Sequence, residues 1–419
     1  MKKIFQYIML AVVTIVMAAC TSDIEETTAT TGKSNVQLVV GEFPAFGDSQ
    51  TRTIGTPDPG KTSWAEGDEL LLEMTSKTFG SKYAAFTYNG SSWELASGEL
   101  SYKEDEVPTF PHVYYAPNYK WEAGKLVLKE GKVAGTDEYI EGTAQITPNG
   151  EAITVKFSEA TRNYSRLRIA TMPNKPITVT IDRYTPAGSS DMKWDQKYAL
   201  TSDEKGNAYL YGTFENNSEV TVKYREAALT THTFSQATES AKSYALDATV
   251  VSLTDEGITY DQIVEDVKKE LDAGKTYINI ILAPDVAKET LEAIHIGLRE
   301  GEANDWSINL TLIGCKKIPS GGFMYWKMLK SIALPDVTEI GENAFLDCTG
   351  LQKVVLGNLT KVYGNVRENG MFNKVDYLTP KLGKEYKVLS NIYSPAPHGK
   401  RQGSICHEEK VAYRPLVIW

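Results

Sequence analysis

The residues best suited to catalysis or metal binding in this chain do not assemble into a recognisable motif. Residues 407–410 (His-Glu-Glu-Lys) begin like a zinc-protease motif, but Val411 stands where the second histidine would be needed. Neither a Gly-x-Ser-x-Gly turn nor a glycine-rich phosphate loop occurs. Glu104–Glu106, Asp191 and Asp195 fall in expected loops, and we interpret them as solvated turn residues. The sequence therefore predicts no catalytic, cofactor-binding or metal-binding site, and we expect no enzyme.

The cysteine for which the sequence predicts a chemical modification is Cys20. The chain starts with Met and two lysines, and Ile4–Met17 is an apolar run too short for a permanent membrane-spanning helix. Such a start, ending in small residues, is typical of a secretory signal peptide. Met17–Cys20 (Met-Ala-Ala-Cys) resembles the lipobox of bacterial lipoproteins. The resemblance implies that residues 1–19 are a signal peptide and that Cys20 is acylated.

Residues 20–35 are expected to form a lipid-anchored polar linker. They are rich in threonine and too poor in apolar side chains to fold. Asp23, Glu25 and Glu26 form an acidic cluster similar to the surface-export signal of lipoproteins from anaerobic gut and oral bacteria. Several buried acyl methylenes make a stable anchor, at about 0.8 kcal/mol each. We therefore expect a lipoprotein of the outer membrane, exposed on the cell surface.

Charge and cysteine content argue against a nucleic-acid-binding protein and against a disulfide-stabilised one. The net charge is −10, and loss of the two N-terminal lysines with the signal peptide makes it more negative still. Because no basic run occurs, no nucleic-acid partner is expected. Cys315, Cys348 and Cys406 remain after lipidation, and an odd number excludes a complete disulfide framework. Cys348 is interpreted as an inert packing residue.

The first half of the mature chain has the alternating pattern of antiparallel strands. Runs such as Leu70–Met74 and Ile177–Ile181 are separated by Gly, Pro, Asn and Asp. Asn89-Gly90 between two such runs predicts a hairpin. A β-sandwich has about 100 residues. The sequence therefore predicts two sandwich domains, at residues 36–160 and 161–254.

Several short motifs occur in this region in a fixed order. They are Thr51–Thr53, Trp64–Asp68, Tyr88 with Trp93, Val113–Pro117, Tyr209–Tyr211 and Tyr244–Leu246. Their order and spacing over residues 36–252 resemble the fimbrillin family, the subunits of type V pili and related surface lipoproteins. The resemblance implies two transthyretin-like β-sandwiches and other fimbrial subunits as partners. Taken singly, these residues are interpreted as packing and turn residues.

The same resemblance draws attention to Arg52. In fimbrillins a trypsin-like protease cuts after an arginine early in the mature chain, which removes the first strand and opens a groove for a partner's strand. Arg52, in Thr51–Thr53, matches that position. The interpretation that we favour is an exposed, uncut arginine near a strand start. Cleavage would remove Cys20 and its lipid, so the anchored and the processed form exclude each other.

After Asp255 the pattern predicts helix-capped repeats at residues 255–372. Ile263, Val264, Val267 and Leu271 have helical spacing, Thr259 or Asp261 is the expected cap, and Gly274 follows the end of the helix. A strand (Tyr277–Leu282) and a second helix (Ala287–Arg299) come next. Leu310, Ile332 and Val354 then recur at an offset of 22, which is typical of leucine-rich repeats. Leu334–Phe345 is similar to the BspA-like subclass of bacterial surfaces. The predicted fold is mainly β: two sandwiches followed by a short α/β solenoid, with residues 373–419 left unassigned.

Three functions are compatible with this organisation. The favoured one is an adhesin or binding protein, acting alone or as a pilus tip or accessory subunit, with the repeats recognising a host protein or glycan whose identity the sequence does not give. The alternative is a structural or anchor subunit of a type V-like fimbria. Against a shaft subunit, fimbrillin shafts donate a free C-terminal strand, whereas here further predicted structure follows the sandwiches. An enzyme is the third, disfavoured by the missing motifs.

The lipid anchor yields a direct prediction. Radiolabelled palmitate should enter the wild-type protein but not Cys20→Ala, whereas Cys348→Ala should be labelled like wild type. Protease treatment of intact cells should digest the wild-type protein if it is surface-exposed. Full resistance to that treatment would exclude surface exposure while leaving lipidation intact.

Overall fold

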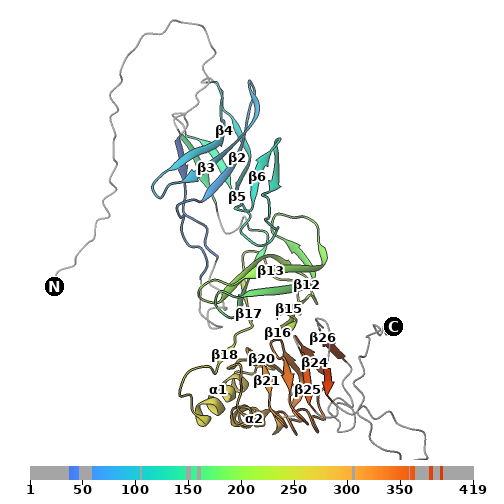
Figure 1. The fold of residues 1–419 in the computed structure, drawn as a ribbon. Coiled ribbons are helices and arrows are strands. Elements are labelled where there is room, and N and C mark those ends of the chain that lie inside the picture. The colour runs from blue at the N-terminus through green and yellow to red at the C-terminus, as the bar shows by residue number, and fades with distance from the viewer. Residues whose placement is uncertain are drawn as a thin grey trace, which may run out of the picture.

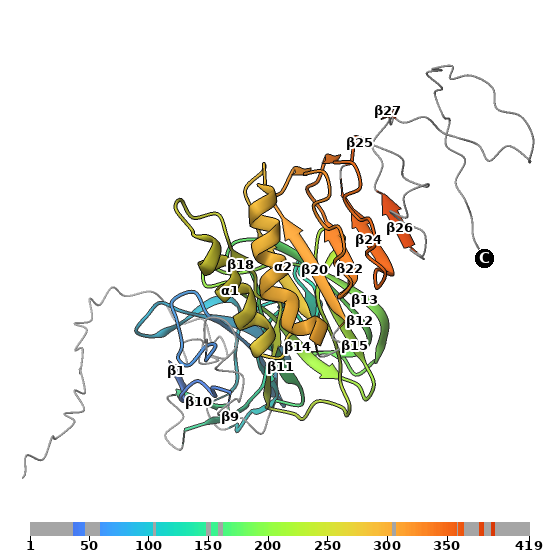
Figure 2. The same ribbon diagram turned by 90° about the horizontal axis from the view of Figure 1, so that it is seen from below.

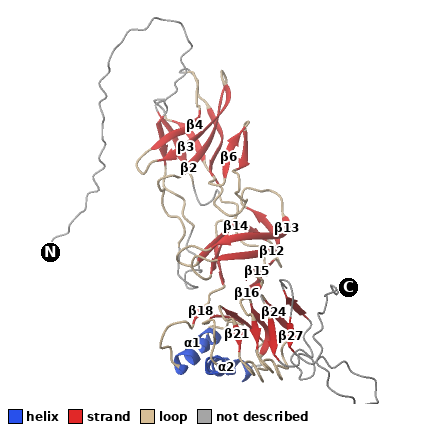
Figure 3. Cartoon of the chain, viewed as in Figure 1, coloured by secondary structure: helices blue, strands red, loops and turns tan. Residues whose placement is uncertain are grey.

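The computed structural model describes residues 37–46, 59–103, 106–147, 152–157, 162–303, 307–357 and 359–363, and the backbone of 377–380 and 387–389. These residues form a mainly β protein, which confirms the expected class. We divide them into a first body (37–157), a second body (162–250) and a third body (251–389), which follow one another in Figure 1. The described helices, α1 and α2, both belong to the third body (Figure 3). Neither has the length and apolar character needed for a membrane crossing.

The first body is an eight-stranded sheet in the order β8-β5-β2-β3-β4-β1-β10-β9, with a separate β6-β7 hairpin. Its strands are β1 (Gln37–Val40), β2 (Glu69–Ser76), β3 (Gly80–Tyr88), β4 (Trp93–Gly98), β5 (Thr109–Tyr115), β6 (Tyr119–Glu122), β7 (Lys125–Leu128), β8 (Ile140–Glu141), β9 (Thr143–Ile146) and β10 (Ala152–Lys156). Alternation along β2 sends Leu70, Leu72 and Met74 into the main core and Leu71 into a smaller cluster. The hairpin predicted at Asn89-Gly90 joins β3 to β4.

The second body is a seven-stranded sheet in the order β16-β15-β12-β14-β11-β17, with β13 also paired to β12. Its strands are β11 (Ser165–Ala170), β12 (Pro176–Pro186), β13 (Lys193–Thr201), β14 (Asn207–Phe214), β15 (Glu219–Tyr224), β16 (Ala227–Thr233) and β17 (Ser243–Asp247). The long β12 pairs with β15 through Thr178–Ile181 and with β14 through Tyr184–Pro186. Because one strand has different neighbours along its length, the sheet curls around its own apolar core.

The third body is a parallel six-stranded sheet, β18-β19-β20-β22-β24-β26, with a smaller parallel sheet, β21-β23-β25-β27. The strands are β18 (Val251–Ser252), β19 (Tyr277–Ile281), β20 (Ile308–Ile313), β21 (Lys317–Ile318), β22 (Leu329–Leu334), β23 (Glu339–Ile340), β24 (Lys353–Leu356), β25 (Lys361–Tyr363), β26 (Tyr377–Pro380) and β27 (Lys387–Leu389). α1 (Tyr260–Asp272) joins β18 to β19, and α2 (Lys288–Ala303) joins β19 to β20. Both helices lie at the β18–β20 end of the sheet (Figure 2).

α1 forms where the sequence predicts it. The Thr259 hydroxyl accepts the N–H of Gln262 at 3.3 Å, and the Gln262 side chain accepts the N–H of Thr259 at 2.9 Å, which is a capping box. Ile263, Val267 and Leu271 are buried against the sheet core. The cap and the apolar spacing therefore act together to set the start and the inward face of the helix.

The 22-residue spacing in the sequence corresponds to parallel strand pairing. Ile332 pairs with Leu310 in β20 and with Val354 in β24. The smaller sheet pairs residues at the same offset: Ile318, Ile340 and Val362. Phe323 and Phe345, one repeat apart, stack with ring centroids 5.1 Å apart. Equivalent apolar side chains thus lie above one another in one core.

Leu334 provides a test of this core because its side chain is fully buried in it. Leu334→Ala should lower the free energy of unfolding by about 2–5 kcal/mol, since it leaves a cavity. Lys330→Ala, an exposed position in the same strand, is the matched control and should change it little. Urea denaturation of the mature protein measures both. Equal stability of the two variants would show that the repeat positions are not a packed core.

Candidate functional site

The residues singled out by the sequence are distributed over several parts of the chain. Cys20 and Arg52 lie outside the described residues, so their modification and processing remain predictions. Asp191 is exposed before β13, whereas Asp195 lies within β13 and not in a loop, with a φ of 49°. Glu106 accepts a hydrogen bond from the Ser76 hydroxyl at 2.9 Å. Within the described ranges, no three His, Cys, Asp or Glu side chains gather as a metal site.

β1 lies inside the first sheet, between β4 and β10, rather than at an edge. All four of its residues pair in parallel with β10, but it meets β4 only where Leu38 pairs with Trp93. Phe43, just after β1, packs edge-on against Trp64 and Tyr115, with centroids 4.9 and 5.5 Å away. Residues 37–46, which precede Arg52 in the chain, therefore contribute to the core of the first body.

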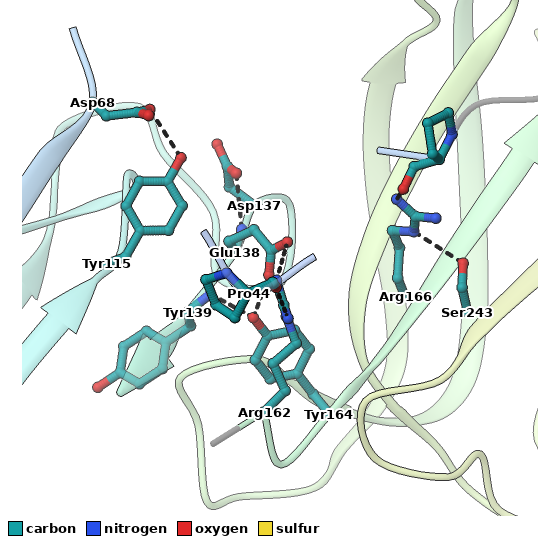
Figure 4. Close-up of polar contacts among 11 residues, drawn as sticks. Pro44, Asp68, Tyr115, Asp137, Glu138, Tyr139, Arg162, Tyr164, Arg166 and Ser243 are labelled. Atoms are coloured by element: carbon teal, nitrogen blue, oxygen red, sulfur yellow. Dashed lines mark hydrogen bonds and ion pairs between the residues drawn. The ribbon is translucent and has the colours of Figure 1, made fainter. Parts of the chain in front are cut away.

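Arg162, which lies just before the first strand of the second body, contacts the end of the segment 37–46. Its guanidinium is buried and forms two hydrogen bonds of 3.1 Å to the two carboxylate oxygens of Glu138. Nη1 also donates to the carbonyl of Pro44, and the ring of Phe46 lies 4.1 Å from the guanidinium carbon. Figure 4 shows Glu138, Pro44 and Tyr164 gathered around Arg162. The contacts join residues of the first body to the segment that leads into β11, the first strand of the second.

Arg166 in β11 contacts the chain where it continues after residue 58. Its Nη1 donates to the carbonyl of Pro59 at 2.9 Å, and its Nε donates to the Ser243 hydroxyl at 2.9 Å (Figure 4). Gly60 has a φ of 76°, which L side chains rarely adopt, and a Cβ added there would displace the guanidinium of Arg166. The two flanks of the stretch that contains Arg52 are thus each hydrogen-bonded to a buried arginine.

Two buried tyrosines complete the polar network at this junction. Burial and the neighbouring Glu138 raise the pKa of Tyr164 well above its usual value, so the phenol stays protonated and donates to Glu138. The Tyr164 oxygen in turn accepts the N–H of Tyr139 at 3.0 Å. Tyr115 donates to Asp68 at 3.1 Å, and its pKa is likewise raised, mainly by burial. These groups act as hydrogen-bonding contacts and not as acids or bases near neutral pH.

The second and third bodies meet through β16, which lies against the six-stranded sheet. The Asn279 side chain donates to the carbonyl of Leu229 at 2.9 Å, and the Thr311 hydroxyl donates to that of Ala228 at 3.3 Å. Next to them is a buried apolar cluster: Ala227, Ala333 and Val355. The covered residues come from β19, β20, β22 and β24. This part of the repeat face is therefore not the open recognition surface that the sequence analysis expected.

An ion pair between Arg225 and Asp336 also joins the second body to the third. Asp336 is buried and accepts a hydrogen bond from Arg225, which follows β15. Its other carboxylate oxygen, Oδ2, accepts the N–H of Gly314 at 2.9 Å. The Nζ of Lys316 lies 3.8 Å from Oδ1, the oxygen that also faces Arg225. One carboxylate thus links the second body to two neighbouring repeats.

The two described cysteines of the third body have the environment of unreactive thiols. Burial raises the pKa of Cys315 to about 11 and that of Cys348 to about 12. Each thiol hydrogen-bonds a backbone carbonyl, Cys315 that of Lys317 and Cys348 that of Phe323. Because the thiolate is the nucleophile, neither is suited to covalent chemistry near neutral pH.

Comparison with known proteins identifies no family. No protein-family model matches the chain, and no curated protein matches it. Among solved structures, the Bacillus anthracis TIE protein shares 12% identity with a TM-score of 0.14, over 54% of this chain and 37% of that one. The pilus backbone RrgB from Streptococcus pneumoniae shares 9% identity with a TM-score of 0.14, over 50% of this chain and 60% of that one. Both likenesses are weak, and in each the match spans less than two thirds of the other protein.

The junction yields a stability prediction. Glu138→Ala leaves the buried Arg162 without its carboxylate, so the free energy of unfolding should fall by about 3–5 kcal/mol. Glu141→Ala is the matched control. The Glu141 side chain is half-exposed and its partner is His112, 3.3 Å away on the surface. Loss of such a surface pair should lower the free energy of unfolding by at most about 1 kcal/mol. Thermal and urea unfolding of the mature protein measure both. A loss no larger in Glu138→Ala than in the control would contradict the assigned role of the buried pair.

Proposed function

We propose that this protein is a cell-surface lipoprotein that binds an extracellular partner as an adhesin, alone or as a tip or accessory subunit of a fimbria. In this proposal Cys20 carries the lipid, the first and second bodies are fimbrillin-type transthyretin-like sandwiches, and the third body is a leucine-rich repeat domain. The many-stranded sheets of the first two bodies and the parallel strands at 22-residue spacing support these finer assignments. The protein acts by binding and not as an enzyme.

The observation that carries the proposal is how the chain continues after the second body. β17 ends at Asp247, and the following Ala248 is fully buried in the second body's core. β18 then enters the third sheet directly, and that sheet is packed on β16. The stretch after the second sheet is therefore folded against its own molecule and is not a free strand for a neighbour. This arrangement favours an anchored or tip protein over a shaft subunit.

The alternative, a structural or anchor subunit, has one observation in its favour. β1 lies between β4 and β10, and β4 meets it at a single residue pair. If the chain were cut after Arg52, loss of β1 would expose the edge of β10 and the core around Leu38. An incoming strand could pair with that edge. A tip subunit would accept a strand at the edge of β10 and would donate none, because the chain after β17 is folded against its own molecule.

The state of the N-terminus separates these alternatives. Most protein on cells should keep its lipidated N-terminus at Cys20, and unboiled samples should show no SDS-resistant ladder. N-terminal sequencing of surface material and paired boiled and unboiled gels measure this. Arg52→Ala should give the same pattern as wild type. A start at Thr53 together with a regular ladder, both absent in Arg52→Ala, would overturn the adhesin proposal in favour of a polymerising subunit.

A further inference from the structure

A pocket of about 320 Å³ lies where the loop between β7 and β8 meets β13 and β14 of the second body. The lining residues with polar or aromatic side chains include Thr136, Asp137, Asp203, Asn207, Tyr209 and Tyr211. Asp137 immediately precedes Glu138 of the buried junction (Figure 4). The volume is near the lower end of the range for small-molecule sites, which favours a single ring over an extended chain.

Asn207, one of the lining residues, carries a buried amide nitrogen that is available as a hydrogen-bond donor. The residue is only 1% exposed, and its Oδ1 accepts a hydrogen bond from Arg168 at 2.9 Å. Its Nδ2 has no hydrogen-bond partner among the described residues. Because the amide is planar and Oδ1 is engaged by Arg168, the position of Nδ2 is fixed. A buried donor of this kind is stabilised by an acceptor supplied from a ligand.

Two carboxylates supply acceptors in the same pocket. Asp203 Oδ1 accepts the N–H groups of Lys205 and Asn207, both at 2.8 Å, and Asp137 Oδ1 accepts the N–H of Glu138 at 2.8 Å. These bonds engage only Oδ1 of each residue. Burial raises the pKa of Asp137, so donors from a ligand would stabilise its charged form.

We propose that this pocket binds the terminal monosaccharide of a neutral glycan. Hydroxyl groups both donate and accept, so one sugar ring can satisfy the carboxylates and the Asn207 donor together. An ammonium group has donors only and would leave Nδ2 unpaired. An anionic ligand would meet two carboxylates, and no lysine or arginine lines the pocket. Tyr209 and Tyr211 add aromatic surface for the apolar face of a sugar.

This assignment rests on the proposed surface-binding function and gives it a ligand class. It also moves recognition away from the repeat face, which β16 partly covers, to the boundary between the first two bodies. The two glycan-contacting elements come from different bodies: Thr136 and Asp137 from the first, Asn207 and Tyr209 from the second. The buried junction at Arg162 therefore also fixes the two walls of the pocket relative to each other.

Saturation-transfer NMR on the mature protein tests the proposal, with methyl glycosides of glucose, galactose, mannose and N-acetylglucosamine as probes. At least one should bind, and Asn207→Asp should weaken it by on the order of tenfold, because it replaces the donor with an acceptor. Asp137→Asn should also weaken binding. Asn207→Asp keeps the oxygen that faces Arg168, and thermal unfolding checks that the variant folds.

Matched controls are Asn217→Asp and Asp191→Asn, which make the same changes at exposed positions and should bind like wild type. Binding of none of the glycosides, binding unchanged in Asn207→Asp, or binding of n-butylamine or sialic acid in preference to them would each overturn the proposal. Cell adhesion separates this from the proposed function. If adhesion is lost on deletion of the protein but kept in Asn207→Asp, the surface function stands and the pocket is not its ligand site. If deletion leaves adhesion unchanged, the adhesin function fails, whereas the NMR result still decides whether the pocket binds sugar.

Discussion

A guanidinium withdrawn from water needs an opposite charge and acceptors for its N–H groups. Arg162 obtains them from Glu138 and from the carbonyl of Pro44, both in the first body. A pair at such depth contributes little net stability compared with apolar packing, but either partner left alone is strongly destabilising. The pair therefore specifies one arrangement of the first two bodies. The position of β1 relative to the second body and the geometry of the pocket both follow from it.

The contact between the second and third bodies uses a different kind of interaction. Side chains of the third sheet reach backbone carbonyls of β16, as with Asn279 and Leu229, and small apolar residues fill the remaining space. Ile313 of β20 belongs to the core of the second body. Hydrogen bonds to backbone groups depend on position and not on the identity of the residue that supplies the carbonyl. The contact thus holds a parallel repeat sheet against a mainly antiparallel one, and it explains why part of the repeat face is covered by the protein itself.

Much of the fold could be predicted wherever the signal is local and periodic. The capping box at Thr259, the hairpin at Asn89-Gly90 and the 22-residue spacing depend on residues close together or repeated at one interval. Leu378 shows the limit of the repeat signal, because it pairs with Val354 at an offset of 24 rather than 22. An insertion between repeats changes the register without changing the apolar pattern.

The junction and the pocket could not be predicted because their residues are distant in the chain. One signal was nevertheless present: Ser165–Ala170 (Ser-Arg-Leu-Arg-Ile-Ala) is a strand buried along its whole length that carries two arginines. Charged residues in such a strand require buried partners, although the sequence does not say which. The same applies to Asn207, which lies in an otherwise ordinary alternating run. Cys20 and Arg52 belong to the opposite class, since sequence motifs alone indicate them.

The parallel pairing of β1 with β10 also has a mechanical consequence. Tension that enters the fold at Gln37 and leaves beyond Lys156 toward the second body pulls the two strands from opposite ends. In that geometry the hydrogen bonds between the strands are loaded in shear, all at once, and do not open one after another. Antiparallel neighbours pulled from the same end would be peeled apart singly. The second body has the same geometry, because its first strand, β11, pairs in parallel with its last, β17. A chain held at its N-terminal side and pulled through its later bodies would thus load the first and second bodies in shear.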